Sequence, residues 1–378
     1  MKIAQLMLFW GLWYLAFSTR TFISPFLPII EAEFAIKHAK AGGLLFFVAG
    51  GSTLALSSAG YLALRIGYKR LIAASFLIMA GALVGLCYAY SYLSFSIVLF
   101  FFGIGGGFYL PCAVPILTDV FNREQWGRAI SVHETAASFN ILSVPFAVAL
   151  ALGVMPWRPI FLVLAALVLI MMLVFWWTTP DPTPQQKGGA PISALLARRD
   201  LWIVFVLWIA SGIGVMGVYN IVPLFLVNEK GMSIEMANRL LSVSRLGGLA
   251  GQISLGFFLD RIKTKSILVF LMIASALSAI GLAAAQPLWL LISMLLLQGT
   301  FCVVFFPAGI VAISKLTTRE ERGLFTGATM AVSMMAGIGI APALFGAIAD
   351  TWSFQIGIYL LGFGTLAVCP LLVFLREI

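Results

Sequence analysis

The chain has 378 residues, of which 62% are hydrophobic and only 10% are charged. A soluble globular domain has roughly 45–50% apolar and about 25% charged residues, so this composition excludes a surface that faces water. The net charge of +9 suggests nucleic acid as a partner, but the basic residues are spread thinly between apolar runs and form no basic face. We therefore expect a polytopic membrane protein that lies in the lipid bilayer and binds no nucleic acid.

Apolar stretches long enough to cross a bilayer recur along the whole chain. A helix that spans ~30 Å of hydrocarbon needs about 20 residues. Such stretches fall near residues 5–30, 41–63, 71–91, 93–119, 128–153, 157–178, 201–228, 236–258, 267–286, 287–315, 322–349 and 353–375. This pattern predicts an all-α membrane protein with twelve transmembrane helices.

Basic residues alternate between the predicted loops. With both termini on one side, that side holds sixteen of the 23 Lys and Arg residues, and the other side holds five. The remaining two, Arg20 and Arg245, lie within predicted spans. The positive-inside rule places the richer side in the cytoplasm. We expect a multi-pass protein of the bacterial inner membrane with both termini cytoplasmic.

The first span carries Arg20 in its interior, at or slightly beyond the midplane. An arginine at this depth costs at least ~2.5–3.5 kcal/mol, so another interaction must offset the cost. Pro25 and Pro28 follow, and a span can bend at such residues and free its carbonyl groups. Two alternatives stay open, since Arg20 can extend outward to the interface or pair with Glu31. Tyr14 is a secondary binding candidate on the same span.

The fifth span contains the stretch "SVHETAASFN" near its cytoplasmic end. Glu134 is the only carboxylate that we place well within a span, which makes it the best candidate for a proton-binding group. His133 can titrate near neutral pH and shares a helical face with Asn140. The alternative is that Glu134 pairs with a basic residue on the cytoplasmic side while His133 faces a groove.

A polar stretch separates the first six spans from the last six. It reads "TTPDPTPQQKGGAPISALLARRD" (178–200) and is rich in Pro, Gly and Gln. Such a composition is typical of a flexible linker. We predict an N-terminal six-helix half at residues 1–178, a cytoplasmic linker at 179–200 and a C-terminal six-helix half at 201–378.

The eighth span carries the second intramembrane arginine. Arg245 lies roughly 14 Å into the membrane at 1.5 Å per residue, too deep to reach the interface. One helical face presents four polar residues, which are Asn238, Ser242, Arg245 and Gln252. Close helix packing is expected along the flank at Gly247, Gly248 and Gly251. The alternative is an arginine paired structurally with a neighbouring helix. Further binding candidates are Tyr219, Asn220 and Gln298.

Two loop segments repeat one pattern. "GYLALRIGYK" (60–69) and "GFFLDRIKTK" (256–265) align without a gap at an offset of 196 residues, and the same offset carries Pro111 to Pro307 and Glu124 to Glu320. Independent segments that keep one offset indicate the duplication of a six-span unit.

With these features the sequence resembles the major facilitator superfamily of secondary transporters over its whole length. The resemblance rests on twelve spans, a central linker and the loop motif G-x-x-x-D-R-x-G-R-K after spans 2 and 8. In the family this loop is a conformational latch, which implies a gating role for Gly60, Arg65, Gly256, Asp260 and Arg261. The first copy has Leu64 in place of the usual Asp, and the second has Lys263 in place of Gly.

The two arginines are not part of the duplicated scaffold, because Arg20 corresponds to Met216 and Arg245 to Ala49. Two inward cations repel each other unless an anion lies between them, and guanidinium groups suit carboxylate, phosphate or nitrate. We predict a secondary active transporter of a small organic or inorganic anion, such as a monocarboxylate. It works by alternating access as a monomer, and proton symport is the favoured coupling.

Two rival functions are weighed against this one. Efflux of a hydrophobic or cationic compound by proton antiport suits a lone acidic residue in an apolar cavity, but not paired arginines. The fifth span, "FNILSVPFAVAL", also lacks the glycine- and proline-rich motif of drug exporters. A non-transporting sensor is disfavoured by the compact loops. The sequence has no phosphate-binding loop, catalytic triad or metal-ligand cluster, so we expect no enzyme, no cofactor and no metal.

Overall fold

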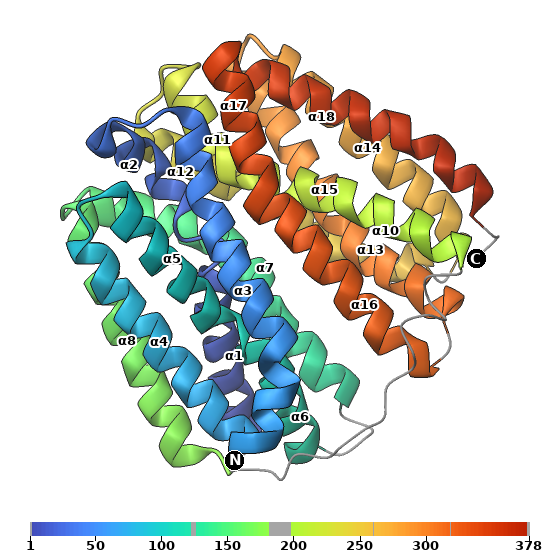
Figure 1. Ribbon diagram of the computed structural model, residues 1–378. Coiled ribbons are helices and arrows are strands. Elements are labelled where there is room, and N and C mark those ends of the chain that lie inside the picture. The colour runs from blue at the N-terminus through green and yellow to red at the C-terminus, as the bar shows by residue number, and fades with distance from the viewer. Residues whose placement is uncertain (1, 122–125, 181–197, 260, 318, 376–378) are drawn as a thin grey trace. The chain divides into compact units, whose positions relative to one another are not determined.

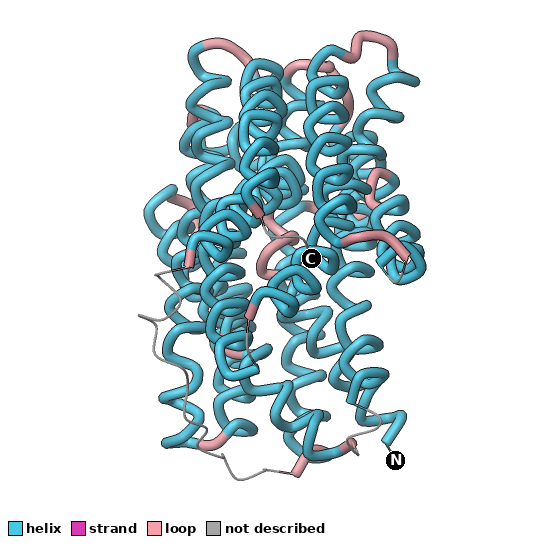
Figure 2. Tube along the Cα trace, turned by 90° about the vertical axis from the view of Figure 1, so that its right-hand side faces the viewer, coloured by secondary structure: helices cyan, strands magenta, loops and turns pink. Residues whose placement is uncertain are grey.

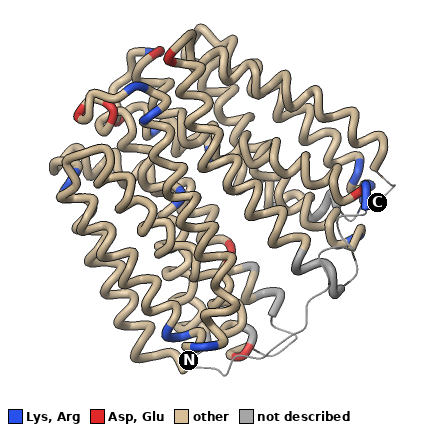
Figure 3. The backbone as a smooth tube through the Cα atoms, in the orientation of Figure 1, with Lys and Arg blue, Asp and Glu red and all other residues tan. Residues whose placement is uncertain are grey.

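The computed structural model describes residues 2–121, 126–180, 198–259, 261–317 and 319–375. These residues form helices joined by short turns, and none of them lies in a strand (Figure 2). Charged residues lie mostly near the helix ends and are sparse along the helix middles (Figure 3). The predicted all-α membrane fold is confirmed.

Contacts divide the chain into two compact units. The first holds residues 1–36 and 44–186, and the second holds residues 37–43 and 187–378. The helices of the first unit are α1 (Lys2–Ser18), the 3₁₀-helix η1 (Ser24–Phe26), α2 (Leu27–Phe34), α3 (His38–Ile66), α4 (Tyr68–Tyr88), α5 (Tyr92–Gly107), α6 (Tyr109–Val120), α7 (Trp126–Leu152) and α8 (Trp157–Thr178). The first residues of α3 cluster with the second unit.

The second unit holds the remaining helices. Its helices are α10 (Arg199–Gly212), the π-helix η3 (Ile213–Gly217), α11 (Val218–Asn228), α12 (Ile234–Val243), α13 (Leu246–Leu259), α14 (Thr264–Ala284), α15 (Leu288–Leu316), α16 (Arg319–Met334), the π-helix η4 (Met335–Ile340), α17 (Ala341–Thr351), α18 (Phe354–Val368) and the 3₁₀-helix η5 (Cys369–Phe374).

The helix boundaries follow the duplication. Helix α4 corresponds to α14, and the stretch from α5 to α6 corresponds to α15, at the same offset of 196 residues at both ends. Packing follows it too, because α4 packs along α5 and α8, and α14 packs along α15 and α18 (Figure 1). The repeated loop pattern therefore reflects a repeated six-span fold.

Among the described residues, ten helical stretches are long and apolar enough to cross a membrane. The two remaining predicted spans, 5–30 and 236–258, are each interrupted. Helix α1 ends at Ser18 and η1 begins at Ser24, while α12 ends at Val243 and α13 begins at Leu246. Each interruption contains one intramembrane arginine. The α-helix ends at Ser18, and Pro25 lies in the 3₁₀-helix η1, so the break in the first span begins before the predicted bend and includes it.

The same local hydrogen bonds accompany both interruptions. In the first interruption, the Thr19 hydroxyl donates to the carbonyl of Ala16 at 2.9 Å, and the Arg20 amide donates to Phe17 O at 2.9 Å. An α-helix would direct that amide to Ala16, four residues back. A hydroxyl that bonds a nearby carbonyl competes with the helical ladder. Thr19 therefore accounts for the local end of the helix.

In the second interruption, Ser244 has the same role as Thr19. Its hydroxyl donates to Leu241 O at 2.6 Å, and the Arg245 amide donates to Ser242 O at 3.0 Å instead of to Leu241. A hydroxyl residue directly before each arginine thus occupies the carbonyl that the arginine amide would use.

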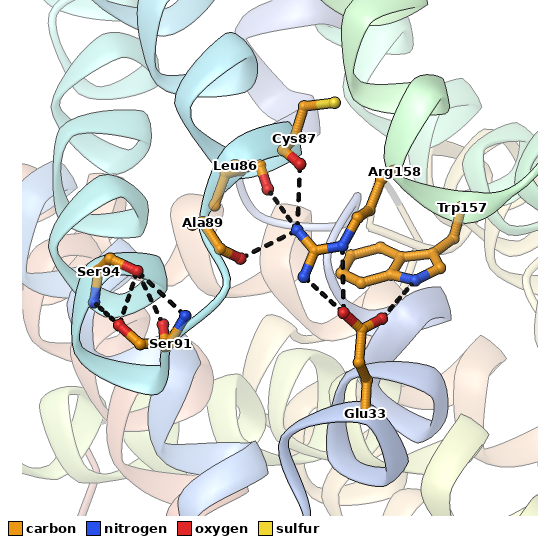
Figure 4. A network of polar contacts seen from close by, with 8 residues as sticks. All are labelled: Glu33, Leu86, Cys87, Ala89, Ser91, Ser94, Trp157 and Arg158. Carbon is orange, nitrogen blue, oxygen red and sulfur yellow. Dashed lines mark hydrogen bonds and ion pairs between the residues drawn. The ribbon is translucent and has the colours of Figure 1, made fainter.

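A cluster at one end of the first unit holds its helices together (Figure 4). Arg158 Nη2 pairs with Glu33 Oε1 at 2.7 Å, and Trp157 Nε1 donates to Glu33 Oε2 at 2.9 Å. Arg158 Nη1 also donates to carbonyls at the C-terminal end of α4, those of Leu86, Cys87 and Ala89. These bonds satisfy carbonyl groups that the end of a helix leaves without partners.

The second unit builds the equivalent cluster from different donors. Glu229 corresponds to Glu33, and its carboxylate accepts the amides of Phe354 and Gln355 at the start of α18. Gln355 Nε2 donates to Ala283 O at 2.7 Å, and Lys230 Nζ donates to Ala285 O at 3.1 Å. These carbonyls are the repeat equivalents of those of Cys87 and Ala89. The duplication thus keeps the carboxylate and the carbonyls and changes the donors.

Candidate functional site

Arg20 lies in the turn between α1 and η1, and two aromatic rings lie against its guanidinium. Its guanidinium carbon is 5.4 Å from the ring centroid of Trp13 and 4.9 Å from that of Phe17. Such cation–π contacts contribute about 0.5–2 kcal/mol each. Helix α5 packs against this turn, because a Cβ on Gly106 would lie 2.2 Å from Thr19 Oγ1. The glycines of "GIGGGF" therefore bring α5 close to the interruption.

Three aromatic rings from three helices stack beside this turn. The Trp13, Tyr109 and His133 rings come from α1, α6 and α7, with centroids 5.6–5.8 Å apart and interplanar angles of 9–16°. The imidazole is 1% exposed. The three centroids form a nearly equilateral triangle, so the imidazole lies against both larger rings, and these contacts restrict its plane.

A chain of polar contacts runs through the same imidazole. Tyr109 Oη donates to Phe9 O at 2.7 Å and lies 3.1 Å from His133 Nε2. On the other side of the ring, His133 Nδ1 lies 3.1 Å from Glu134 Oε1. The Glu134 side chain is 48% exposed. The structure thus brings together the two predicted proton-coupling residues and links them to Tyr109.

Asn140 connects α7 to the interrupted first span. Its Oδ1 accepts from Thr21 Oγ1 at 2.6 Å, and its Nδ2 donates to Tyr14 O at 2.8 Å and Ser18 Oγ at 2.7 Å. Its place two turns after His133 on the same helical face is the sequence signal for this role. The predicted binding residue Tyr14 is half-buried, and its hydroxyl lies 2.9 Å from Ser143 Oγ.

In the second unit, Arg245 lies between α12 and α13 and is only 3% exposed. Within the described part of the chain, none of its three side-chain nitrogens has a hydrogen-bond partner. The nearest aromatic contact is Tyr219 of α11, whose ring centroid is 5.2 Å from the guanidinium carbon. A buried charge without hydrogen bonds is costly, and an anion that accepts from the guanidinium would offset that cost.

Polar groups of α14 and α15 lie near this guanidinium. Gln298 Nε2 donates to Gly214 O at 2.7 Å, and Cys302 Sγ lies 2.8 Å from Ser275 Oγ. The sequence analysis did not select Cys302 or Ser275, because nothing in their local sequence indicates the contacts that they make with each other and with Gln298.

Glycines allow α13 and α15 to approach closely, as predicted. A Cβ on Gly247 would lie 2.0 Å from Thr300 Oγ1, and one on Gly251 would lie 2.6 Å from Val304. A Cβ on Gly299 would lie 2.7 Å from Ser244 O and 3.2 Å from Arg245 Nη1. The interruption and its arginine therefore rest against a glycine of α15.

The remaining predicted binding residues are distributed around this region. Tyr219 and Asn220 are buried in α11, and Asn238 and Ser242 are buried in α12. Gln252 is half-buried in α13. The prediction of one continuous helical face from Asn238 to Gln252 was wrong, because the Ser244 hydrogen bond ends α12 before Arg245.

The predicted gating residues lie away from both arginine regions in sequence. The Arg65 guanidinium stacks on Tyr61 of its own helix at 4.4 Å, and a Cβ on Gly60 would meet no atom within 4 Å. Arg261 is exposed. Asp260 lies outside the described residues, and the surroundings of Gly256 do as well. A latch role for these residues stays a prediction.

Comparison with known proteins gives the class of this fold. The family model described as Major Facilitator Superfamily matches residues 9–288 and 240–378. The chain therefore belongs to the major facilitator superfamily. It is a multi-pass membrane transporter and not an enzyme.

Several relatives are similar over much of their length. The cis,cis-muconate transport protein of Acinetobacter baylyi is 24% identical over 89% of this chain and 85% of its own. The 3-(3-hydroxy-phenyl)propionate transporter of Escherichia coli is 24% identical over 59% of this chain and 57% of its own. Sugar efflux transporter A of Dickeya chrysanthemi is 24% identical over 74% of this chain and 72% of its own.

Solved structures agree on the fold. The nucleoside transporter NupG superposes with a TM-score of 0.85 over 98% of this chain and 100% of its own, at 15% identity. At that identity the likeness shows the fold alone.

Proposed function

We propose that this chain is a secondary transporter that moves a small organic anion, such as a carboxylate, together with a proton by alternating access. The observation that carries the proposal is Arg245, a buried guanidinium whose three nitrogens lack hydrogen-bond partners in the described part of the chain. A carboxylate accepts two parallel hydrogen bonds from a guanidinium, so it matches the donors that Arg245 leaves free.

Arg20 is the second proposed anion contact. The Trp13 and Phe17 rings contact its guanidinium and supply no hydrogen-bond acceptor of their own to its nitrogens. Two of the relatives described above carry names of carboxylates, muconate and hydroxyphenylpropionate. Those names support an organic anion over an inorganic one.

The coupling ion in this proposal is a proton, held by His133 and Glu134. Their contact at 3.1 Å joins a buried imidazole to a half-exposed carboxylate within an apolar helix. A carboxylate inside a membrane span is costly and is commonly part of a proton pathway in transporters.

Binding and uptake test the proposal directly. The purified protein is heated with cis,cis-muconate, 3-(3-hydroxyphenyl)propionate, benzoate or phosphate, and with sucrose and tetraphenylphosphonium as uncharged and cationic controls. We expect a carboxylate to raise the unfolding temperature and to accumulate in proteoliposomes under an inward proton gradient. Stabilisation by the cation or by sucrose alone, with efflux in place of uptake, would favour an exporter instead.

Membrane orientation and oligomeric state belong to the same proposal. We infer that the loops rich in Lys and Arg face the cytoplasm of a bacterial cell, with both termini on that side, and that the transporter acts as a monomer. Labelling of single cysteines at positions 66 and 154 with a membrane-impermeant reagent tests the orientation. Only position 154 is expected to react in intact cells whose outer membrane has been permeabilised.

A further inference from the structure

We infer that the second unit recognises two ends of its anion, a carboxylate that accepts from Arg245 and a hydroxyl group that donates to Gln298 Oε1. The transported anion is then a hydroxycarboxylate rather than an acid whose carboxylate is its only polar group. This inference rests on the proposed function and narrows the class of substrate. It makes Gln298 the residue that sets specificity, beside the arginine that supplies the charge.

The side-chain amide of Gln298 has a fixed orientation. Its Nε2 donates to Gly214 O at 2.7 Å and to Cys302 Sγ at 3.4 Å. An amide nitrogen has two protons, and these two contacts use both of them. The opposite orientation would direct Oε1 at the carbonyl oxygen of Gly214, and two acceptors repel each other. The oxygen is therefore the end of this amide that remains for another partner.

No donor reaches that oxygen within the described residues. Gln298 is fully buried, and its Oε1 has no hydrogen-bond partner in that part of the chain. An acceptor that is buried without a donor destabilises a protein. A role in joining α15 to the π-helix η3 explains the contacts of Nε2 and leaves the oxygen unexplained. A bound group that donates a hydrogen bond accounts for both ends of the amide.

Arg245 has the complementary requirement. It is 3% exposed, and its three side-chain nitrogens need acceptors. An ionised carboxylate supplies acceptors to the guanidinium, but it has no proton to donate to Gln298 Oε1. A hydroxycarboxylate supplies both, because its hydroxyl group is a donor. The two residues together therefore favour the hydroxylated acid.

Gly299 connects the two residues along α15. A Cβ on this glycine would lie 3.2 Å from Arg245 Nη1 and 3.5 Å from Arg245 Cζ. Because consecutive Cα atoms are about 3.8 Å apart, the Cα of Gln298 lies within about 9 Å of the guanidinium carbon. Gly299 itself has no side chain that could separate the two groups. One small organic acid is long enough to contact both residues.

The repeat indicates that these polar residues are not part of the shared scaffold. At the offset of 196 residues, Gln298 corresponds to Phe102, which is also fully buried. The glycines on α15 and α5 do correspond. A Cβ on Gly103 would lie 2.1 Å from a carbonyl oxygen of α3, and one on Gly299 would lie 2.7 Å from the carbonyl oxygen at the end of α12. The two halves thus share the close helix contact, and only the second places an amide beside it.

Matched pairs of acids test the inference on the parent protein. Calorimetry measures the affinity for 3-(3-hydroxyphenyl)propionate against 3-phenylpropionate, and for lactate against propionate. The members of each pair differ only by one hydroxyl group. We expect the hydroxylated member of at least one pair to bind roughly 2- to 12-fold more tightly, which is the gain from one net hydrogen bond. Equal affinities within both pairs would overturn the inference.

Gln298→Met separates specificity from affinity. Methionine has a similar length and lacks the amide oxygen, so the variant should bind both members of a pair equally. Its affinity for the acid without a hydroxyl group should stay close to that of the parent, since Arg245 is retained. Ser278→Ala is the matched control, because its buried hydroxyl donates to Ser275 O within α14. The control is expected to keep the preference of the parent.

The possible failures are separable. Absence of binding by every carboxylate would refute the proposed function. An unchanged preference in Gln298→Met, or a preference lost equally in Ser278→Ala, would refute the role of Gln298 and leave the anion site at Arg245 in place. The comparison of pairs in the parent protein needs no variant, so it decides the inference even where a substitution prevents folding.

Discussion

The two interrupted helices differ in how each unit neutralises its arginine. Arg20 has a carboxylate, Glu134, within electrostatic reach and two aromatic rings against its guanidinium. Arg245 has one aromatic ring and, in the described part of the chain, no hydrogen-bond partner for its nitrogens. Under the proposed function, both arginines contact the transported anion, and proton coupling belongs to the first unit, which also supplies Glu134.

The repeat sharpens this contrast, because neither interruption has a copy in the other half. Met216, the equivalent of Arg20, lies in the π-helix η3, which remains helical. Ala49, the equivalent of Arg245, lies in the unbroken α3. Duplicated scaffolds keep their helices and diverge in side chains. Here the helical ladder itself has diverged, at the two places where a cation lies within a span.

The largest effect is expected from Glu134→Gln. If coupling belongs to the first unit, this variant cannot release a proton, so accumulation driven by a pH gradient should be abolished. Exchange of labelled for unlabelled carboxylate across proteoliposomes should stay largely intact, since anion binding does not require the proton to leave. Full accumulation by the variant would return Glu134 to a structural role.

Arg245 should give the largest change in affinity. Loss of charge-assisted hydrogen bonds worth about 1.5–3 kcal/mol predicts binding roughly 10- to 100-fold weaker in Arg245→Met. Arg245→Lys should also weaken binding, because a point charge lacks the planar fork. The unliganded Met variant should unfold at a higher temperature than the parent, since it removes a buried charge that lacks partners. Lower stability together with unchanged affinity would indicate a purely structural arginine.

These arginines show what the sequence could and could not predict. Their depth follows from hydropathy and position alone, as does the duplication, because apolar runs and loop motifs are local patterns. The stack of Trp13, Tyr109 and His133 joins three helices, and no spacing in the sequence predicts it. The interruptions had a local signal that was overlooked, a hydroxyl residue directly before each arginine. The prolines indicated only the later part of the first interruption, since Pro25 lies in η1.

That signal leads to the third prediction. Ser244→Ala and Thr19→Val remove the hydroxyls that occupy Leu241 O and Ala16 O. The amides of Arg245 and Arg20 can then bond four residues back, and the helices should become more continuous. We expect slower hydrogen exchange at these amides and several-fold weaker carboxylate binding. Ser254→Ala is a matched control, because its hydroxyl bonds Ala250 within an unbroken helix. Equal effects in all three variants would contradict the role assigned to the two hydroxyls.

The end clusters of the two units offer a comparison in stability. Arg158→Ala removes an ion pair to Glu33 and the donor for α4 carbonyls (Figure 4), for which we expect a loss of about 1.5–3 kcal/mol. Gln355→Ala removes one neutral hydrogen bond to Ala283, so about 0.5–1.5 kcal/mol is expected. Unfolding in mixed detergent micelles measures both free energies. Equal losses would mean that the charge on Arg158 adds nothing to the cluster.

The smallest effect concerns the repeated loop, where the two copies differ in backbone as well as in sequence. Gly67 has a φ of 87°, a left-handed value that favours glycine, whereas its equivalent Lys263 has a φ of −54°. The first copy also has exposed Leu64, which cannot accept hydrogen bonds or interact with a helix N-terminus as the carboxylate of Asp260 can.

We therefore expect the first copy to hold the cytoplasmic side closed less firmly than the family pattern would. Leu64→Asp should favour the outward-open state, and Asp260→Ala should favour opening inward. A shift of ~1.4 kcal/mol changes a two-state ratio tenfold, which distance distributions between spin labels on the cytoplasmic loops can resolve. Identical distributions in both variants and the parent would refute the latch role. Arg245 and the His133–Glu134 pair would keep their assignments in that case, since neither depends on the loop.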